Sequence, residues 1–142
     1  TGADAVDNES RVYPNRRIDI KAAYDALQPN NPLEILNSSG DMVAWFGSFG
    51  GGVITGTVEE YSNYQEQPDD LLVIDNNGQA TFIIAHNGSI YMDSLLTENY
   101  EVTPSADDVF GFYNSSGDLT GVITKYGYMT LKGALITEGV LP

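Results

Sequence analysis

The chain has 142 residues, no cysteine, and 20 acidic against 6 basic residues, which gives a net charge of −14 at pH 7. This balance excludes nucleic acid as the natural partner, because binding to phosphate backbones depends on Lys and Arg. The absence of cysteine excludes disulfides and thiolate metal sites, and no apolar run reaches the about 18 residues of a membrane helix, so we expect no membrane insertion.

The N-terminal part of the chain differs in charge from the rest. Residues 1–32 hold four of the six cations and have a balance of −1, whereas residues 33–142 have a balance of −13. This asymmetry predicts an N-terminal arm that contacts an acidic body, within one chain or between neighbouring chains. Residues 11–20 read as extended with a break at Pro14. Residues 19–28 form at most one short helix.

The body is a repeat. Its three copies cover about residues 33–70, 71–108 and 109–142, and "NSSGD" occurs in both the first and the third. Each copy has two glycines ten residues apart, at the same place in the copy. These glycines are Gly40 and Gly50, Gly78 and Gly88, and Gly117 and Gly127. Two glycines at one spacing in three copies indicate internal repetition.

Each copy is predicted to be a three-stranded antiparallel meander. The first glycine follows Asn or Asp as a type I turn closed by a left-handed residue requires, and the second glycine ends the next turn in the same way. Turns this short join antiparallel neighbours. The fold class is therefore all-β.

The middle strands are apolar on one face and nearly so on the other, which predicts that the copies pack on one another. One central position of this strand holds Ala44, Phe82 or Gly121, as facing layers of different size require. The sequence leaves two arrangements open: a stacked or sandwich-like repeat, or a closed domain with pseudo-threefold symmetry such as a trefoil or prism.

The pattern of an apolar strand, "NSSGDMVAW", a second glycine turn and a closing "TLKG" resembles short β repeats of secreted bacterial and archaeal surface proteins and of phage tail-fibre-like proteins. The resemblance covers residues 33–58, 71–96 and 109–136. It implies an extracellular, fibrous or adhesive protein without enzymatic activity. The N-terminal Thr-Gly-Ala-Asp lacks an initiator Met and a signal-peptide core, and we therefore expect a mature form, after removal of a signal peptide.

No catalytic, cofactor or metal site is predicted. His86 is the only histidine, so imidazole pairs for catalysis or metal binding are missing. The acidic pairs Asp69–Asp70 and Asp107–Asp108 lack the ligand spacing of a calcium loop, and solvated turn carboxylates explain them better. Four Asn-x-Ser sequons are candidate glycosylation sites: Asn8, Asn37, Asn87 and Asn114.

Two functions remain after these exclusions. The first is a secreted structural subunit that polymerises with copies of itself, its arm leaving its own body to pair as an added strand with the next subunit. The arm residues predicted at this interface are Arg11, Val12, Tyr13, Arg16, Arg17, Ile18 and Ile20. Arg16 and Arg17 would face carboxylates of the neighbour. The second is an extracellular glycan-binding module that uses exposed tyrosines.

Overall fold

The computed structural model describes residues 16–18, 33–47, 50–60, 65–76 and 79–141, and every element in this part of the chain is a β-strand. The predicted all-β class is thus confirmed, while the helix expected within 19–28 lies outside the described residues. The strands are β1 Arg16–Ile18, β2 Leu33–Leu36, β3 Met42–Phe46, β4 Gly52–Ile54, β5 Val58–Glu60, β6 Leu72–Asn76, β7 Gln79–Ile84, β8 Ile90–Met92, β9 Leu96–Thr97, β10 Asp108–Tyr113, β11 Leu119–Thr124, β12 Met129–Leu131 and β13 Leu135–Ile136.

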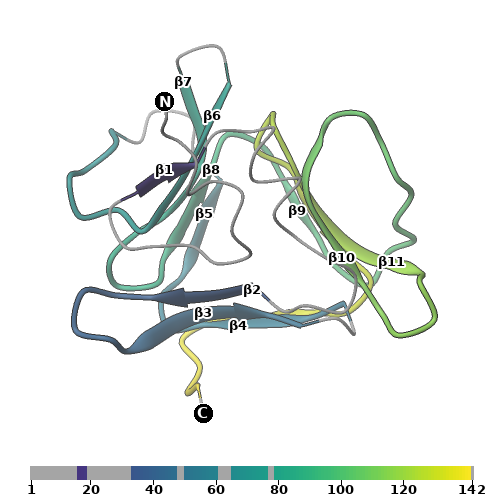
Figure 1. The fold of residues 1–142 in the computed structure, drawn as a ribbon, viewed down its shortest axis with the longest axis horizontal. Helices are drawn as coiled ribbons and strands as arrows, with labels where there is room; N and C mark the ends of the chain where they lie inside the picture. The colour runs from purple at the N-terminus through teal and green to yellow at the C-terminus, as the bar shows by residue number, and fades with distance from the viewer. Residues whose placement is uncertain (1–15, 19–32, 48–49, 61–64, 77–78, 142) are drawn as a thin grey trace.

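Each copy contributes one antiparallel meander, as the glycine turns predict. The meanders are β2-β3-β4, β6-β7-β8 and β10-β11-β12. Figure 1 shows the three sheets as the sides of a triangle, with copy 1 at the bottom, copy 2 on the left and copy 3 on the right.

A fourth short strand leaves each copy and pairs parallel with the third strand of the next sheet. We call β5, β9 and β13 the exchange strands. β5 of copy 1 pairs with β8, β9 of copy 2 pairs with β12, and β13 of copy 3 pairs with β4. Because β13 of copy 3 pairs with copy 1, the exchange of strands runs in a complete cycle through the three copies. Of the two arrangements that the sequence allows, the structure therefore has the closed one.

The second turn of each copy interlocks with the preceding copy. The second turns are residues 85–88 and 124–127, and of the equivalent turn in copy 1 the structure describes Gly47 and Gly50. The hydroxyl of Thr55 in copy 1 donates a hydrogen bond to the backbone carbonyl oxygen of Asn87 in copy 2 (2.7 Å). In the same way, the hydroxyl of Thr81 in copy 2 donates to the backbone carbonyl oxygen of Lys125 in copy 3 (2.7 Å). In copy 1, Gly50 lies against copy 3, where a Cβ added to this glycine would be 2.9 Å from the backbone oxygen of Thr120. Because these turns cover the outer face of the middle strands, Thr81 and Thr120 are buried there.

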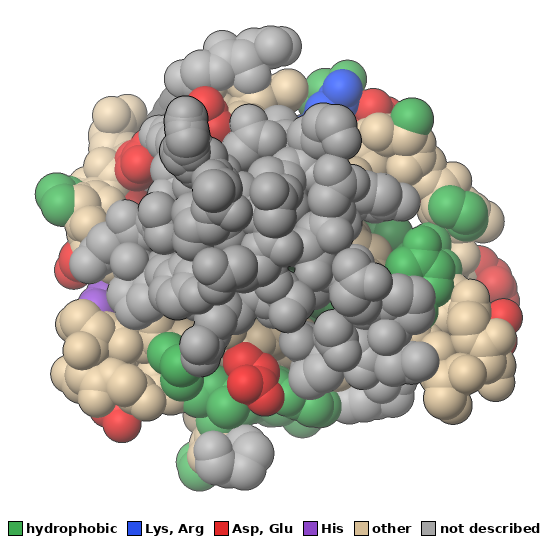
Figure 2. Space-filling view, viewed as in Figure 1, with side chains coloured by type: hydrophobic (Ala, Val, Ile, Leu, Met, Phe, Trp, Pro, Cys, Tyr) green, Lys and Arg blue, Asp and Glu red, His purple; other side chains and the backbone are tan. Residues whose placement is uncertain are grey.

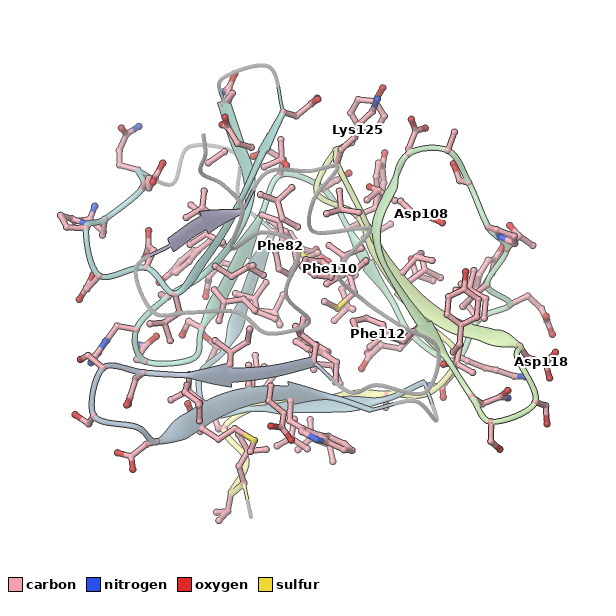
Figure 3. All side chains as sticks on the ribbon, viewed as in Figure 1. Phe82, Asp108, Phe110, Phe112, Asp118 and Lys125 are labelled. Atoms are coloured by element: carbon pink, nitrogen blue, oxygen red, sulfur yellow. The ribbon has the colours of Figure 1, made fainter. Side chains whose placement is uncertain are left out.

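One hydrophobic core fills the space between the three sheets. It draws its buried side chains from all three copies, and the rings of Phe46 and Phe112 stack across copies with centroids 5.7 Å apart. Figure 3 shows Phe82, Phe110 and Phe112 inside the triangle. The copies therefore bury their apolar faces against one another, as expected from their sequence.

Cross-strand partners account for the small residues at this central core position in copies 1 and 3. Ile35 pairs with Ala44, Ile74 with Phe82, and Phe112 with Gly121. All these positions are buried. Copy 3 thus places its large ring on the first strand, and a Cβ added at Gly121 would lie 3.0 Å from the Phe112 ring.

The first turns are not identical in the three copies. In copies 1 and 3 the asparagine Oδ1 accepts hydrogen bonds from two backbone N–H groups, and Gly40 and Gly117 have φ of 86° and 85°. The pairs that frame these turns are Leu36 with Met42 and Tyr113 with Leu119. In copy 2 the pairing continues past Asp75 with Ala80 to Asn76 with Gln79. The strands of copy 2 thus pair further into "DNNGQ" than those of copies 1 and 3 pair into "NSSGD". Residues 77–78, which include Gly78, lie outside the described residues.

Candidate functional site

The most distinctive surface feature is the set of outer sheet edges. The first strand of each meander, β2, β6 or β10, lies at the side of its sheet away from the exchange strand. Within the described residues, β2 and β10 are the terminal strands of their sheets. A strand in this position has one row of backbone N–H and C=O groups directed away from its sheet, which can pair with another strand.

The outer edge of copy 2 carries a strand from the N-terminal arm. β1 pairs parallel with β6, and the register matches Arg16 with Leu72, Arg17 with Val73 and Ile18 with Ile74. Of the predicted interface residues, Arg16, Arg17 and Ile18 thus lie in a strand that is paired within its own chain. Arg11, Val12, Tyr13 and Ile20 lie outside the described residues. Pairing with a neighbouring chain stays a prediction.

The three outer edges present different residues at equivalent positions. Pairing with the middle strands aligns residues 33–35 of β2, 72–74 of β6 and 110–112 of β10. Eight of these nine residues are apolar or glycine and are buried, whereas Glu34, at the centre of the β2 triplet, is exposed. β6 has Val73 there and β10 has Gly111. The sequence gives one signal for this feature, a single carboxylate within the apolar run "LEIL".

The paired aspartates before the second and third copies close turns. Asp70 accepts a hydrogen bond from the N–H of Gln67 (2.6 Å), and Asp108 accepts one from the N–H of Ser105 (2.9 Å). The other carboxylate oxygen of Asp108 is buried without a hydrogen-bond partner. Burial raises the pKa of Asp108, although the hydrogen bond from Ser105 acts in the opposite direction. These carboxylates thus have a structural role.

The described sequons have different environments. Asn37 and Asn114 open exposed turns and are followed by exposed serines. In the Asn87 sequon, Ser89 is buried and its Oγ accepts a hydrogen bond from the N–H of Thr57 (3.1 Å). Asn87 itself is exposed whereas Asn37 and Asn114 are half-buried, so the buried Ser89 is the feature that sets the Asn87 sequon apart. Asn8 lies outside the described residues.

Among the described residues, the most exposed aromatic side chains lie in copy 3 and its preceding link. Tyr126 and Tyr128 are 47% and 45% exposed on either side of Gly127, and Tyr100 is 62% exposed. The amine of Lys125 lies 5.3 Å from the centroid of the Tyr126 ring and also 3.5 Å from Asp107. Copy 2 has Asn87 and Ser89 at the positions of the two turn tyrosines. This surface is therefore not repeated in the second copy.

Charged side chains do not assemble into a reactive cluster in the part of the chain that the structure describes. Figure 2 shows acidic groups distributed around the rim of the view, and no group of three or more potential metal ligands occurs among the described residues. His86 is half-buried in the second turn of copy 2. No helix within the described ranges is long and apolar enough to cross a membrane.

Comparison of the chain with protein families, with curated proteins and with solved structures found no match.

Proposed function

We propose that this protein is a secreted structural subunit that assembles with copies of itself into an extracellular filament or surface layer. Its N-terminal arm pairs with a neighbouring subunit by strand addition. The observation that carries this proposal is the pairing of β1 with β6, because it makes the outer edge of a repeat sheet an acceptor for the arm. β2 and β10 are equivalent edges that end their sheets among the described residues.

The closed arrangement determines where subunits can join. Because β13 of copy 3 pairs with β4 of copy 1, the first and last copies contact each other in the part of the chain that the structure describes. Among the described strands, β2 and β10 end their sheets, and these edges are sites at which a sheet can be extended. Strand addition at an edge uses main-chain hydrogen bonds and thus needs no deep pocket.

The charge distribution supports contact between the arm and another part of the protein. The arm holds Arg11, Arg16, Arg17 and Lys21, while residues 33–142 have a balance of −13. Attraction between a basic segment and an acidic body favours their encounter and weakens as salt is added. The extracellular location rests on the composition and on the resemblance to secreted repeats.

Negative-stain electron microscopy of the full chain and of a variant lacking residues 1–20 tests this proposal. We expect filaments or sheets from the full chain and dispersed particles from the truncated one. Arg17→Pro, which removes a backbone donor from β1, should weaken assembly, and Arg17→Lys serves as its control. Undiminished assembly without the arm would contradict the strand-addition mechanism. Dispersed particles from both proteins would contradict self-assembly itself.

A second candidate function is carbohydrate binding, which the closed pseudo-threefold arrangement and the exposed tyrosines of copy 3 favour. Sugar rings stack on exposed aromatic faces, and Tyr126 and Tyr128 lie close together in sequence at one turn. A glycan array on the full chain tests this function. Tyr126→Ala should then reduce binding, whereas Tyr100→Ala, in a different segment, is the control. A monodisperse monomer that binds no glycan would contradict both functions.

A further inference from the structure

The outer edge of β2, which ends its sheet among the described strands, has the features of an acceptor for the arm. We infer that the arm of one subunit adds to β2 of the next, with Arg17 beside Glu34; this inference rests on the proposed self-assembly. The first argument is the equivalence of the edges. β2 pairs with β3 as β6 pairs with β7, so the backbone groups that β6 offers to β1 have counterparts on β2.

The second argument is the register. In the pairing observed on β6, Arg17 is matched with Val73. The same register on β2 matches Arg17 with Glu34, and on β10 it matches Arg17 with Gly111. Neighbours in register on adjacent strands interact, and an opposite-charge pair is favourable there. Glu34 is exposed, and it is the only carboxylate among the nine equivalent edge positions. For pairing between subunits, the charge of Arg17 therefore favours β2 over the other two edges.

The third argument is the connection between the arm strand and the body. Fourteen residues separate Ile18 from Leu33. A segment of this length spans up to about 50 Å when extended, which allows the strand to reach an edge of an adjacent subunit. Because the arm and β2 are different surfaces, the contact joins subunits head to tail. Such heterologous contacts form open chains when they do not close into a ring. One donor and one acceptor per subunit then produce an unbranched filament.

Engineered cysteine pairs test the acceptor directly, because the chain has no native cysteine. Neighbours in register on adjacent strands are about 5 Å apart, within the range that a disulfide bridges. The test pair is Arg17→Cys with Glu34→Cys. Arg17→Cys with Val73→Cys reports the β6 edge, and Arg17→Cys with Gly111→Cys reports the β10 edge. Each protein is assembled, oxidised and run on a denaturing gel without reductant, and a part of the same sample is imaged.

We expect a ladder of covalent oligomers from the 17/34 pair, and we expect it to collapse to monomer with reductant. Filaments together with an intermolecular ladder from the 17/73 or 17/111 pair, and none from 17/34, would overturn the choice of β2 while leaving self-assembly intact. No filaments and no ladder from any pair, with the 17/73 pair linked only within monomers, would overturn self-assembly and this inference with it.

Charge exchange gives a second test that does not depend on cysteine. Glu34→Gln should raise the critical concentration for assembly by up to about fivefold, the range expected for an exposed ion pair. Glu34→Arg should raise it further, and combining it with Arg17→Glu should restore assembly. Glu59→Arg, which alters an exposed glutamate on the exchange strand β5, is the matched control. No rescue by the double variant, or an equal effect of Glu59→Arg, would overturn the pairing of Arg17 with Glu34.

Discussion

The glycines in the two turns of a copy have the same backbone conformation, but the structure requires glycine at each for a different reason. Gly88 and Gly117 have φ of 86° and 85°, a region that side chains with a Cβ rarely adopt. An added Cβ at Gly117 would meet nothing within 4 Å, whereas one at Gly88 would collide with Thr55 Oγ1 and lie 2.7 Å from the carbonyl oxygen of Val43. The first turn thus requires glycine for its conformation alone. The second also requires it for contact between copies.

Alanine at these two positions should separate the two requirements. Gly117→Ala should lower the free energy of unfolding by about 1–2 kcal/mol, the cost of the left-handed conformation. Gly88→Ala should cost more, because the neighbouring copy must also move. Chemical denaturation of both variants measures the difference. Equal losses would show that the contact between copies adds nothing at this position.

The buried carboxylate of Asp108 should make stability depend on pH. Burial raises the pKa of this group in the folded chain, so the folded state binds its proton more readily than the unfolded state. The associated destabilisation is present at neutral pH and is relieved as pH falls through the folded-state pKa. Asp93 has a pKa raised by the same cause and should act in the same direction.

Comparison of Asp108→Asn with the unchanged chain tests this dependence. The asparagine does not titrate, so the stability of the unchanged chain relative to the variant should increase between neutral and mildly acidic pH. Thermal unfolding at several pH values measures the change. Asp118→Asn, at an exposed turn position, is the control. A stability difference that stays constant with pH would refute the role of Asp108.

At the scale of elements, side-chain size is set by pairs of strands and not by single positions. Phe112 and Gly121 are cross-strand partners in copy 3, and the equivalent partners in copy 1 are Ile35 and Ala44. The volume of each pair is shared between two strands. From copy 1 to copy 3 the residue on the first strand becomes larger and its partner on the middle strand becomes smaller, whereas copy 2 pairs Ile74 with Phe82 and does not follow this compensation.

A double-mutant cycle tests this coupling. Gly121→Ala alone should cost about 1–3 kcal/mol, because its Cβ crowds the Phe112 ring. Combining it with Phe112→Ile recreates the pair of copy 1 and should recover part of that loss. Recovery should be incomplete, since stacking of Phe112 on Phe46 is also lost. Additive losses in the double variant would show that the two positions are independent.

At the scale of the molecule, the last exchange strand closes the domain. β13 pairs with β4. The Leu135 side chain is buried, with 7% of its surface exposed, and its backbone N–H donates a hydrogen bond to Glu98 Oε2 (2.7 Å). Beyond β13, Glu138 and Gly139 donate backbone hydrogen bonds to copy 1. The C-terminal segment therefore joins the two ends of the repeat series.

Removal of this closing strand should destabilise the whole molecule. Deletion of residues 135–142 should lower the free energy of unfolding by at least about 2 kcal/mol, the value of burying one leucine side chain. Deletion of residues 140–142, where Val140 is 94% exposed, should have little effect. Denaturation with urea compares the two proteins. An unchanged midpoint after the longer deletion would show that closure contributes no stability.

The sequence by itself determined the local structure of this protein. The spacing of the glycines and the alternation of apolar residues predicted the three meanders, because turns and strand faces depend on residues close in the chain. The parallel pairing of the exchange strands with the next copy was not predicted. β9 and β13 have two residues each and lie in segments rich in turns, so no local pattern distinguishes them.

Tertiary structure alone decided the closure of the domain and the character of its edges. The return of β13 to β4 depends on contacts between residues about 80 positions apart, which local preferences do not encode. The same holds for Glu34. In the sequence it is one carboxylate of twenty, and its significance appears only when pairing places β2 at the end of a sheet. The interactions of a charged side chain depend on its neighbours in space. Those neighbours are determined by the packing of the three apolar faces against one another.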